Sequence, residues 1–165
     1  MPWQSKKLFM KLKVEMKPAS EIVTVLNNLI ETNSDRIKGY EKAAEDAPDN
    51  EIKELCNSNA SQSKAFKTQL EQLVKEYHGK INDKSSVSGA VYRAAMEAKH
   101  SISGSNKSVL SSCEMGEEVA LENYKHAKID SLGFPARIVS IILNQNSEIS
   151  RARDRVSLYR NALKD

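Results

Sequence analysis

Apolar residues recur at helical spacing along four separate stretches of the chain. When successive residues are stepped by about 100°, each stretch gathers its large apolar side chains on one face. The stretches span residues 21–46, 50–78, 107–128 and 136–163. The segments that separate them contain proline, glycine and capping residues, at Pro48-Asp49, His78-Gly79, Ser105-Asn106 and Gly133-Phe134-Pro135. The pattern therefore predicts four long amphipathic helices.

Short polar residues and a glycine are predicted to set the helix ends. Ser20, Asp49 and Ser105 are each placed to cap a helix N-terminus with a side-chain oxygen. Gly79 is placed to end the second helix in the left-handed conformation, which glycine adopts without strain. The apolar face of the first helix is predicted to contain Leu26, Leu29, Ile30, Ile37, Tyr40 and Ala44.

The lengths of the connections choose between bundle topologies. The first and third connections contain only a few residues, so each must join two antiparallel neighbours. The second runs from Gly79 to Asn106, and it can return along the second helix, which spans about 43 Å at about 1.5 Å per residue. It is predicted to contain a short helix near residues 91–102, and the helices on either side of it would then point the same way. The expected fold class is an all-α, ferritin-like four-helix bundle with this long crossover between its second and third helices.

The basic charge of the chain is concentrated at its beginning. The net charge is +3, but residues 1–19 hold five lysines against one acid, so the rest is close to neutral. We expect residues 1–19 to form a basic, flexible arm and residues 20–165 to form the bundle. The lysines that could contact nucleic acid or an anionic surface are Lys6, Lys7, Lys11, Lys13 and Lys17. Two alternatives stay open: a tail without a partner, and a native product that starts near Met16.

Composition and motifs exclude several classes of protein. Only 6 Gly and 4 Pro among 165 residues disfavour a turn-rich all-β fold. The longest apolar run, residues 138–143, contains Ser140 and is far shorter than the about 18 residues that cross a bilayer. The chain has no nucleotide-binding loop, nucleophile motif or zinc-ligand spacing. Cys56 and Cys113 lack a Cys-x-x-Cys spacing and are predicted to be reduced, buried small residues.

Polar residues interrupt the apolar faces near the middle of the predicted helices. They are Asn33, Asn59, Ser63, Glu117 and Gln145. Burying an unpaired carboxylate is costly, so Glu117 must have partners or carry a proton. One interpretation is a hydrogen-bonded layer that fixes the helix register. The other is a small metal or proton site in the bundle core.

The residues fit a di-iron site poorly. Ferritin-like di-iron sites use a Glu-x-x-His on each of two helices, and the match in this chain, Glu97 to His100, falls in the predicted crossover. The remaining candidate metal ligands are Glu114, Glu117, Gln145 and Glu148. No catalytic or cofactor-binding residue is predicted, and iron or another divalent metal remains an alternative.

Tyrosines and glycines on the predicted helices carry two structural predictions. Each helix places one tyrosine on its apolar face, and these rings are expected to pack near the bundle ends with their hydroxyls in water. The four tyrosines are Tyr40, Tyr77, Tyr124 and Tyr159. Gly39 and Gly116 lie inside helices, where glycine costs about 1 kcal/mol relative to alanine. We expect them to leave room for a crossing segment.

Several segments resemble an uncharacterised bacterial family. Residues 112–118, with the run Cys-Glu-Met-Gly-Glu, resemble its most recognisable motif. Further similar segments are residues 26–32 and 35–43 in the first helix, 60–63 with Phe66 and Leu70 in the second, Tyr92-Arg93 in the crossover, and Gln145, Glu148 and Asp154-Arg155 in the last helix. The family is catalogued as a domain of unknown function and described as ferritin-like four-helix bundles.

The resemblance covers roughly residues 21–160 and implies the ferritin-like fold, a cytoplasmic setting and little established chemistry. Many members have a histidine before the Asp-Arg pair of the last helix, where this chain has Arg153. Our leading interpretation is a non-enzymatic bundle, related to stress or envelope physiology, that acts through oligomers or partners. The alternatives are a metal-binding, di-iron-like bundle with a degenerate site and a nucleic-acid-associated bundle that uses the basic arm. The sequence does not decide whether the protein is an enzyme.

Overall fold

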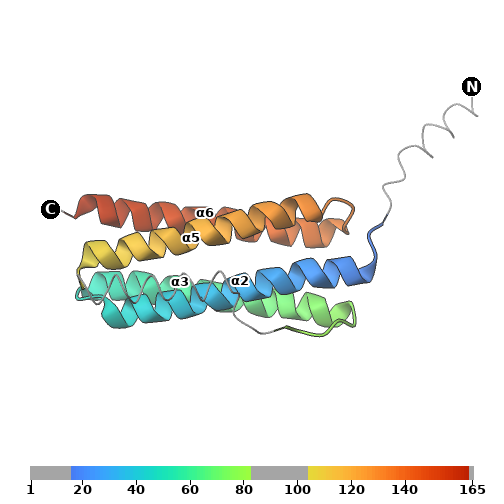
Figure 1. Cartoon of the computed structure of the whole chain (residues 1–165), viewed down its shortest axis with the longest axis horizontal. Coiled ribbons are helices and arrows are strands. Elements are labelled where there is room, and N and C mark those ends of the chain that lie inside the picture. The colour runs from blue at the N-terminus through green and yellow to red at the C-terminus, as the bar shows by residue number, and fades with distance from the viewer. Residues whose placement is uncertain (1–15, 83–103, 164–165) are drawn as a thin grey trace, which may run out of the picture.

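The computed structural model describes residues 16–82 and 104–163 and arranges four helices within them as one elongated bundle (Figure 1). These helices are α2 (Ala19–Asp46), α3 (Asn50–Glu76), α5 (Asn106–Asp130) and α6 (Ala136–Ala162). Their bounds agree with the four predicted helices to within two residues at each end. The described residues therefore confirm an all-helical fold with four long helices.

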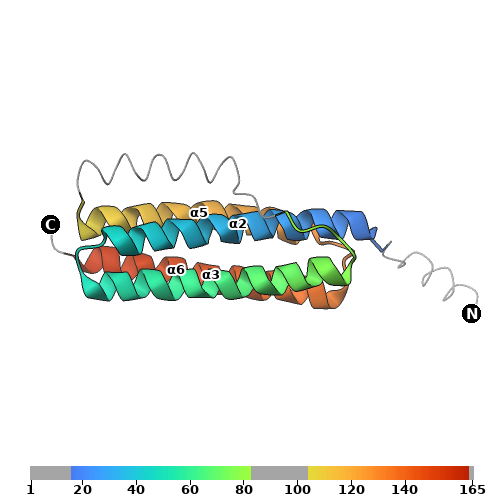
Figure 2. The ribbon, with the colours of Figure 1, turned by 90° about the horizontal axis from the view of Figure 1, so that it is seen from below.

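The helices pair as two hairpins that lie side by side. α2 packs against α3 and α5 against α6, while α2 also contacts α5 and α3 contacts α6 (Figure 2). The Asp49 backbone N–H donates to Asn106 Oδ1 at 3.3 Å, which brings the starts of α3 and α5 to the same end. At the other end, Arg137 at the start of α6 donates to Glu76 at the end of α3. α3 and α5 consequently run in the same direction (Figure 1).

Two sequence predictions lie outside the described residues. One is the path of the crossover and its short helix near residues 91–102, so the ferritin-like crossover stays a prediction. The other concerns most of the basic arm. Lys17 is described and pairs with Glu21 at 3.1 Å, while Lys6, Lys7, Lys11 and Lys13 are not.

Two of the three predicted N-caps are confirmed, and one is wrong. Asp49 Oδ1 accepts the Glu51 N–H at 2.8 Å, and Ser105 Oγ accepts the Ser108 N–H at 3.1 Å. Ser20, in contrast, lies inside α2, which begins at Ala19. The Pro18 carbonyl already accepts the N–H groups of the first turn, so the helix starts before Ser20 can cap it.

The end of α3 differs from the prediction for Gly79. The left-handed residue is His78, with φ of 54°, whereas Gly79 is not among the residues with positive φ. Glycine is needed at position 79 for a different reason, because a Cβ there would lie 2.6 and 2.7 Å from the two methyl groups of Val23. Close approach of the chain to α2, and not backbone handedness, explains this glycine.

The bundle core consists of two apolar clusters with polar residues between them. One cluster includes Leu26, Leu70, Tyr124 and Ile138, and the other includes Ile52, Cys56, Val109 and Val156. The buried face of α2 differs from the predicted apolar face, since Ile37 is only half-buried while Arg36 is buried. The reason is that Arg36 finds an acidic partner in the core. No described helix is long and apolar enough to cross a membrane.

Candidate functional site

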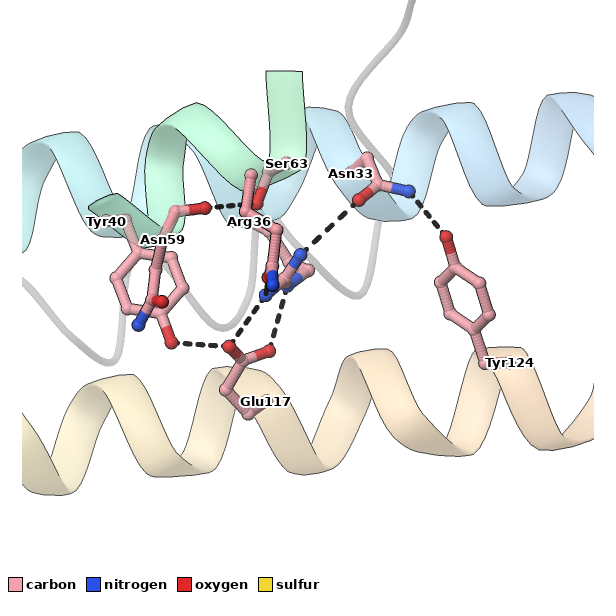
Figure 3. A network of polar contacts seen from close by, with 8 residues as sticks. Asn33, Arg36, Tyr40, Asn59, Ser63, Glu117 and Tyr124 are labelled. Carbon is pink, nitrogen blue, oxygen red and sulfur yellow. Dashed lines mark hydrogen bonds and ion pairs between the residues drawn. The ribbon is translucent and has the colours of Figure 1, made fainter. Parts of the chain in front are cut away.

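An arginine–glutamate pair occupies the middle of the bundle, buried from solvent. The side chains of Arg36 on α2 and Glu117 on α5 are 3% and 0% exposed. Arg36 Nε donates to Glu117 Oε2 and Arg36 Nη2 to Glu117 Oε1, both at 2.8 Å, so the contact is bidentate (Figure 3). The Tyr40 hydroxyl also donates to Oε1, at 2.5 Å. Both carboxylate oxygens are therefore engaged, and the predicted need of Glu117 for partners is met.

Hydrogen bonds extend from this pair toward the other helices. Arg36 Nη1 approaches Asn33 Oδ1 at 3.5 Å, and Asn33 Nδ2 donates to the Tyr124 hydroxyl at 2.8 Å (Figure 3). The Tyr124 hydroxyl donates in turn to Gln145 Oε1 on α6 at 2.6 Å. Gln145 Nε2 then donates to Gln69 Oε1 on α3 at 2.8 Å. One polar network thus connects all four described helices.

The surroundings raise the pKa values of Arg36 and of the two tyrosines in this network. Burial disfavours a charged guanidinium, but the charge of Glu117 and its hydrogen bond raise the pKa of Arg36 above its usual value. Burial, and next the charge of Glu117, raise the pKa of Tyr40 well above that of a free tyrosine. Burial likewise raises the pKa of Tyr124. Both tyrosines are therefore neutral hydrogen-bond donors. The prediction that they pack near the bundle ends with their hydroxyls in water is wrong for these two, because their hydroxyls bond inside the core.

The structure does not gather the four candidate metal ligands into one donor set. Glu117 and Gln145 belong to the same network but are joined only through intervening side chains. Glu114 accepts a hydrogen bond from Ser157 and pairs with Arg160, and Glu148 pairs with Arg151. Within residues 16–82 and 104–163, no three His, Cys, Asp or Glu side chains are close enough together to hold a metal ion. These residues do not fit a paired metal centre.

Arg153, which stands where the resembling family has a histidine, also has acidic partners. It pairs with Glu118 on α5 and with its neighbour Asp154, the latter at 3.0 Å. Its side chain is 30% exposed, so it lies at the edge of the bundle, whereas the Arg36–Glu117 pair is buried. A ligand at this position would have to replace an ion pair between α5 and α6.

Comparison with known families decides the kinship of the chain. A family profile described as a domain of unknown function (DUF2383) matches residues 21–128, which is more than half of the chain. The chain belongs to the DUF2383 family. The DUF2383 match contains Arg36, Tyr40 and Glu117, while Gln145 and Glu148 lie beyond it. Among curated proteins, none matches the chain.

A small cavity lies beside the ion pair of this DUF2383 protein, between α2 and α5. Its volume is about 30 Å³, and its lining includes Arg36, Glu117, Cys113, Gly39 and Gly116. This volume suits a single water-sized molecule. The two mid-helix glycines line the same space, one from each helix. The expectation that they leave room for a crossing segment stays a prediction, because the crossover lies outside the described residues.

The two cysteines of the DUF2383 protein lie in the same apolar cluster, a proximity that the sequence-based prediction did not include. Cys56 and Cys113 are free and buried, and their thiols interact. Cys56 lies six residues into α3 and Cys113 seven residues into α5. Because these helices start at the same end and run the same way, both cysteines come to the same height. The predicted parallel direction of these helices, together with the similar distance of each cysteine from its helix start, would therefore have been enough to predict this proximity.

Asn59 on α3 is a buried amide without a visible partner. It is 1% exposed, and neither its side-chain oxygen nor its nitrogen has a hydrogen-bond partner among the described residues. Only its backbone carbonyl is engaged, accepting from the Ser63 hydroxyl at 2.8 Å (Figure 3). Buried amides of this kind are rare in native proteins, so Asn59 marks a point where the network is incomplete.

Proposed function

We propose that this DUF2383 protein is a non-enzymatic, ferritin-like four-helix bundle that acts through contacts with partners or further copies of itself. The observation that carries the proposal is the state of Glu117, the only buried carboxylate among the described residues. Both of its oxygens accept hydrogen bonds from Arg36 and Tyr40. A metal centre or a general base would need a carboxylate oxygen that is free to bind a ligand or a proton.

The charge at the centre supports the same proposal. In a carboxylate-bridged metal site the cations neutralise the buried acids, whereas here the guanidinium of Arg36 neutralises Glu117. A divalent cation at Glu117 would have to displace this guanidinium and then remain close to its positive charge. Such a rearrangement would also break the hydrogen bonds of Arg36 to Glu117 and to Gln62.

The direction of the helices supports the ferritin-like part of the proposal. A simple up-down bundle alternates its helix directions, whereas α3 and α5 run the same way. A connection between them must span the length of the bundle, as in ferritin-like folds. The stress-related role and the bacterial origin remain predictions from the resemblance.

Exposed apolar residues at one end of the bundle support action through protein contacts. Ile129 at the end of α5 and Leu132 after it are 59% and 70% exposed, and Met16 beside the start of α2 is 74% exposed. Ile129 and Leu132 line a groove with Val25 of α2. Light scattering over a range of concentrations should show self-association of the wild type that the double variant Ile129→Ser/Leu132→Ser weakens.

Metal loading tests the central claim directly. The full-length protein is mixed with excess Fe(II) in air, passed through a desalting column and assayed for bound iron, beside a Glu117→Gln variant. We expect less than stoichiometric iron on the wild type and the same small amount on the variant. Stoichiometric iron on the wild type that disappears in Glu117→Gln would overturn the proposal in favour of the metal-binding alternative.

A further inference from the structure

The contact between Cys56 and Cys113 joins two parts of the bundle that the chain connects only at a distance. Cys56 belongs to the α2–α3 hairpin and Cys113 to the α5–α6 hairpin. Both side chains lie in the same apolar cluster and are 1% and 4% exposed. A covalent bond between them would fasten one hairpin to the other across the core.

Cys113 also lines the small cavity between α2 and α5, whereas Cys56 does not. The cavity of about 30 Å³ admits a molecule near the size of water and excludes a bulky reagent such as a disulfide peptide. It is lined in part by Val119, which is 36% exposed, so it lies near the bundle surface. The geometry therefore presents one thiol to a small neutral reagent and holds the second thiol behind it.

We propose that Cys56 and Cys113 form a reversible disulfide when a small hydroperoxide reaches Cys113 through this cavity, and that the bond locks the two hairpins together. This inference does not depend on the proposed function, because it concerns the thiols and not the Arg36–Glu117 pair.

The oxidation takes place in two steps, with hydrogen peroxide as the oxidant. Cys113 Sγ gives up its proton and attacks one peroxide oxygen, the O–O bond breaks, and the departing hydroxide takes up that proton as water. Cys113 is then a sulfenic acid. Cys56 Sγ next attacks Cys113 Sγ, the S–O bond breaks, and the hydroxide leaves as a second water with the proton from Cys56. Two thiols lose two electrons, and one peroxide is reduced to two waters.

The order of attack follows from access, because Cys113 lines the cavity and Cys56 does not. The surroundings of Cys113 predict a slow reaction. The Cys56 thiol, together with burial, raises the pKa of Cys113 well above its ordinary value, so its reactive thiolate is scarce. We expect single oxidation events over minutes to hours, followed by return to dithiol only with a reductant, and no peroxidase turnover.

The experiment uses the full-length protein, reduced with dithiothreitol, desalted and then treated with hydrogen peroxide. Intact mass should fall by about 2 Da as two thiols are lost. A tryptic digest without reductant should contain residues 54–64 linked to residues 108–125. Thermal unfolding should shift upward by about 10 °C, because the bond closes a loop of more than fifty residues. Dithiothreitol should reverse all three changes.

Single variants assign the order and control for nonspecific oxidation. Cys56→Ala should stop at a sulfenic acid on Cys113, a gain of about 16 Da that a sulfenic-acid probe captures. Cys113→Ala should react far more slowly, because Cys56 does not line the cavity. Circular dichroism first establishes that each variant is folded. If a variant does not fold, the digest of the wild type still tests whether the disulfide forms.

Three results would overturn the proposal. The first is an unchanged native mass under peroxide that does oxidise the urea-unfolded chain to the 2 Da product. The second is oxidation that yields only linked dimers on a non-reducing gel. The third is a disulfide that leaves the thermal transition where it was, since the bond would then not hold the hairpins together.

Discussion

Replacing Arg36 with methionine removes the cation from the centre of the bundle while keeping a long side chain there. The substitution deletes both 2.8 Å hydrogen bonds to Glu117 and the 3.1 Å bond to Gln62. It leaves a carboxylate that is 0% exposed, with the Tyr40 hydroxyl as its remaining donor among the described residues. Removing one member of a buried ion pair costs about 3–5 kcal/mol, most of it from the charge left without a partner.

A second variant separates the cost of the unpaired Glu117 charge from the cost of lost packing. Arg36→Met/Glu117→Leu removes both charges. It leaves the Tyr40 hydroxyl without its acceptor, and the side-chain oxygens of Gln62 and Asn33 without the guanidinium donor, at a cost of about 1–2 kcal/mol. The double variant should therefore be more stable than Arg36→Met alone. Arg151→Met is the matched control, since Arg151 is exposed and pairs with the neighbouring Glu148. Its expected cost is below about 1 kcal/mol.

Urea unfolding followed by circular dichroism at neutral pH measures all three variants. We expect stability to decrease in the order wild type, Arg151→Met, the double variant and Arg36→Met. A loss below about 1 kcal/mol for Arg36→Met would show that Glu117 is not held as a buried charge. A double variant less stable than Arg36→Met would show that the ion pair adds more stability than apolar side chains would in its place.

Three further predictions concern the tyrosines, the end of α3 and the unpartnered amide. Burial raises the pKa of Tyr40 and Tyr124, so the unfolded chain loses these protons first as the pH rises. The free energy of unfolding should therefore fall above about pH 10, by about 1.4 kcal/mol per pH unit for each tyrosine. Urea unfolding between pH 9 and 11 should show this fall, which Tyr40→Phe/Tyr124→Phe should make smaller; an equal fall in that variant would contradict the burial argument. His78→Gly should raise stability by about 1 kcal/mol, because φ of 54° strains histidine but not glycine; an unchanged melting temperature would argue against that strain. Asn59→Leu should raise the free energy of unfolding by about 1–2 kcal/mol by removing an amide without partners; a loss of stability would reveal a bound water or other partner.

The four helices and their hairpin pairing could be predicted from the sequence because those features depend on local information. Helical periodicity and the proline and capping residues located each of the four described helices to within two residues. The errors at the helix ends have two different causes. The error at the start of α2 has a local cause, since the Pro18 carbonyl accepts the N–H groups of the first turn and the helix begins before Ser20. Gly79 is set by its approach to Val23, which depends on geometry that no single stretch of sequence contains.

The candidate site was predicted only in part, because a hydropathy pattern reveals a buried polar residue only where that residue interrupts an expected apolar face. Glu117, Asn33 and Gln145 interrupt apolar faces and were identified for that reason. Arg36 was missed since the pattern favoured its neighbour Ile37, which is only half-buried. The sequence predicts that Glu117 needs a partner, and this need is confirmed, with Arg36 as the partner. Its identity depends on which helix lies beside α5.

The position of the polar network between two apolar clusters bears on why the bundle adopts one register. Apolar faces pack against each other with little directional preference, so a shift of α5 along α2 by one turn would keep much of that contact. The same shift, about 5.4 Å, exceeds the reach of any hydrogen bond. It would leave Arg36 and Glu117 buried apart, each without its partner, and it would separate Asn33 from Tyr124. Because the network reaches α3 and α6 through Gln145 and Gln69, the penalty applies to the placement of all four helices. We infer that the apolar clusters drive assembly, while the network selects the one alignment in which every charge is paired.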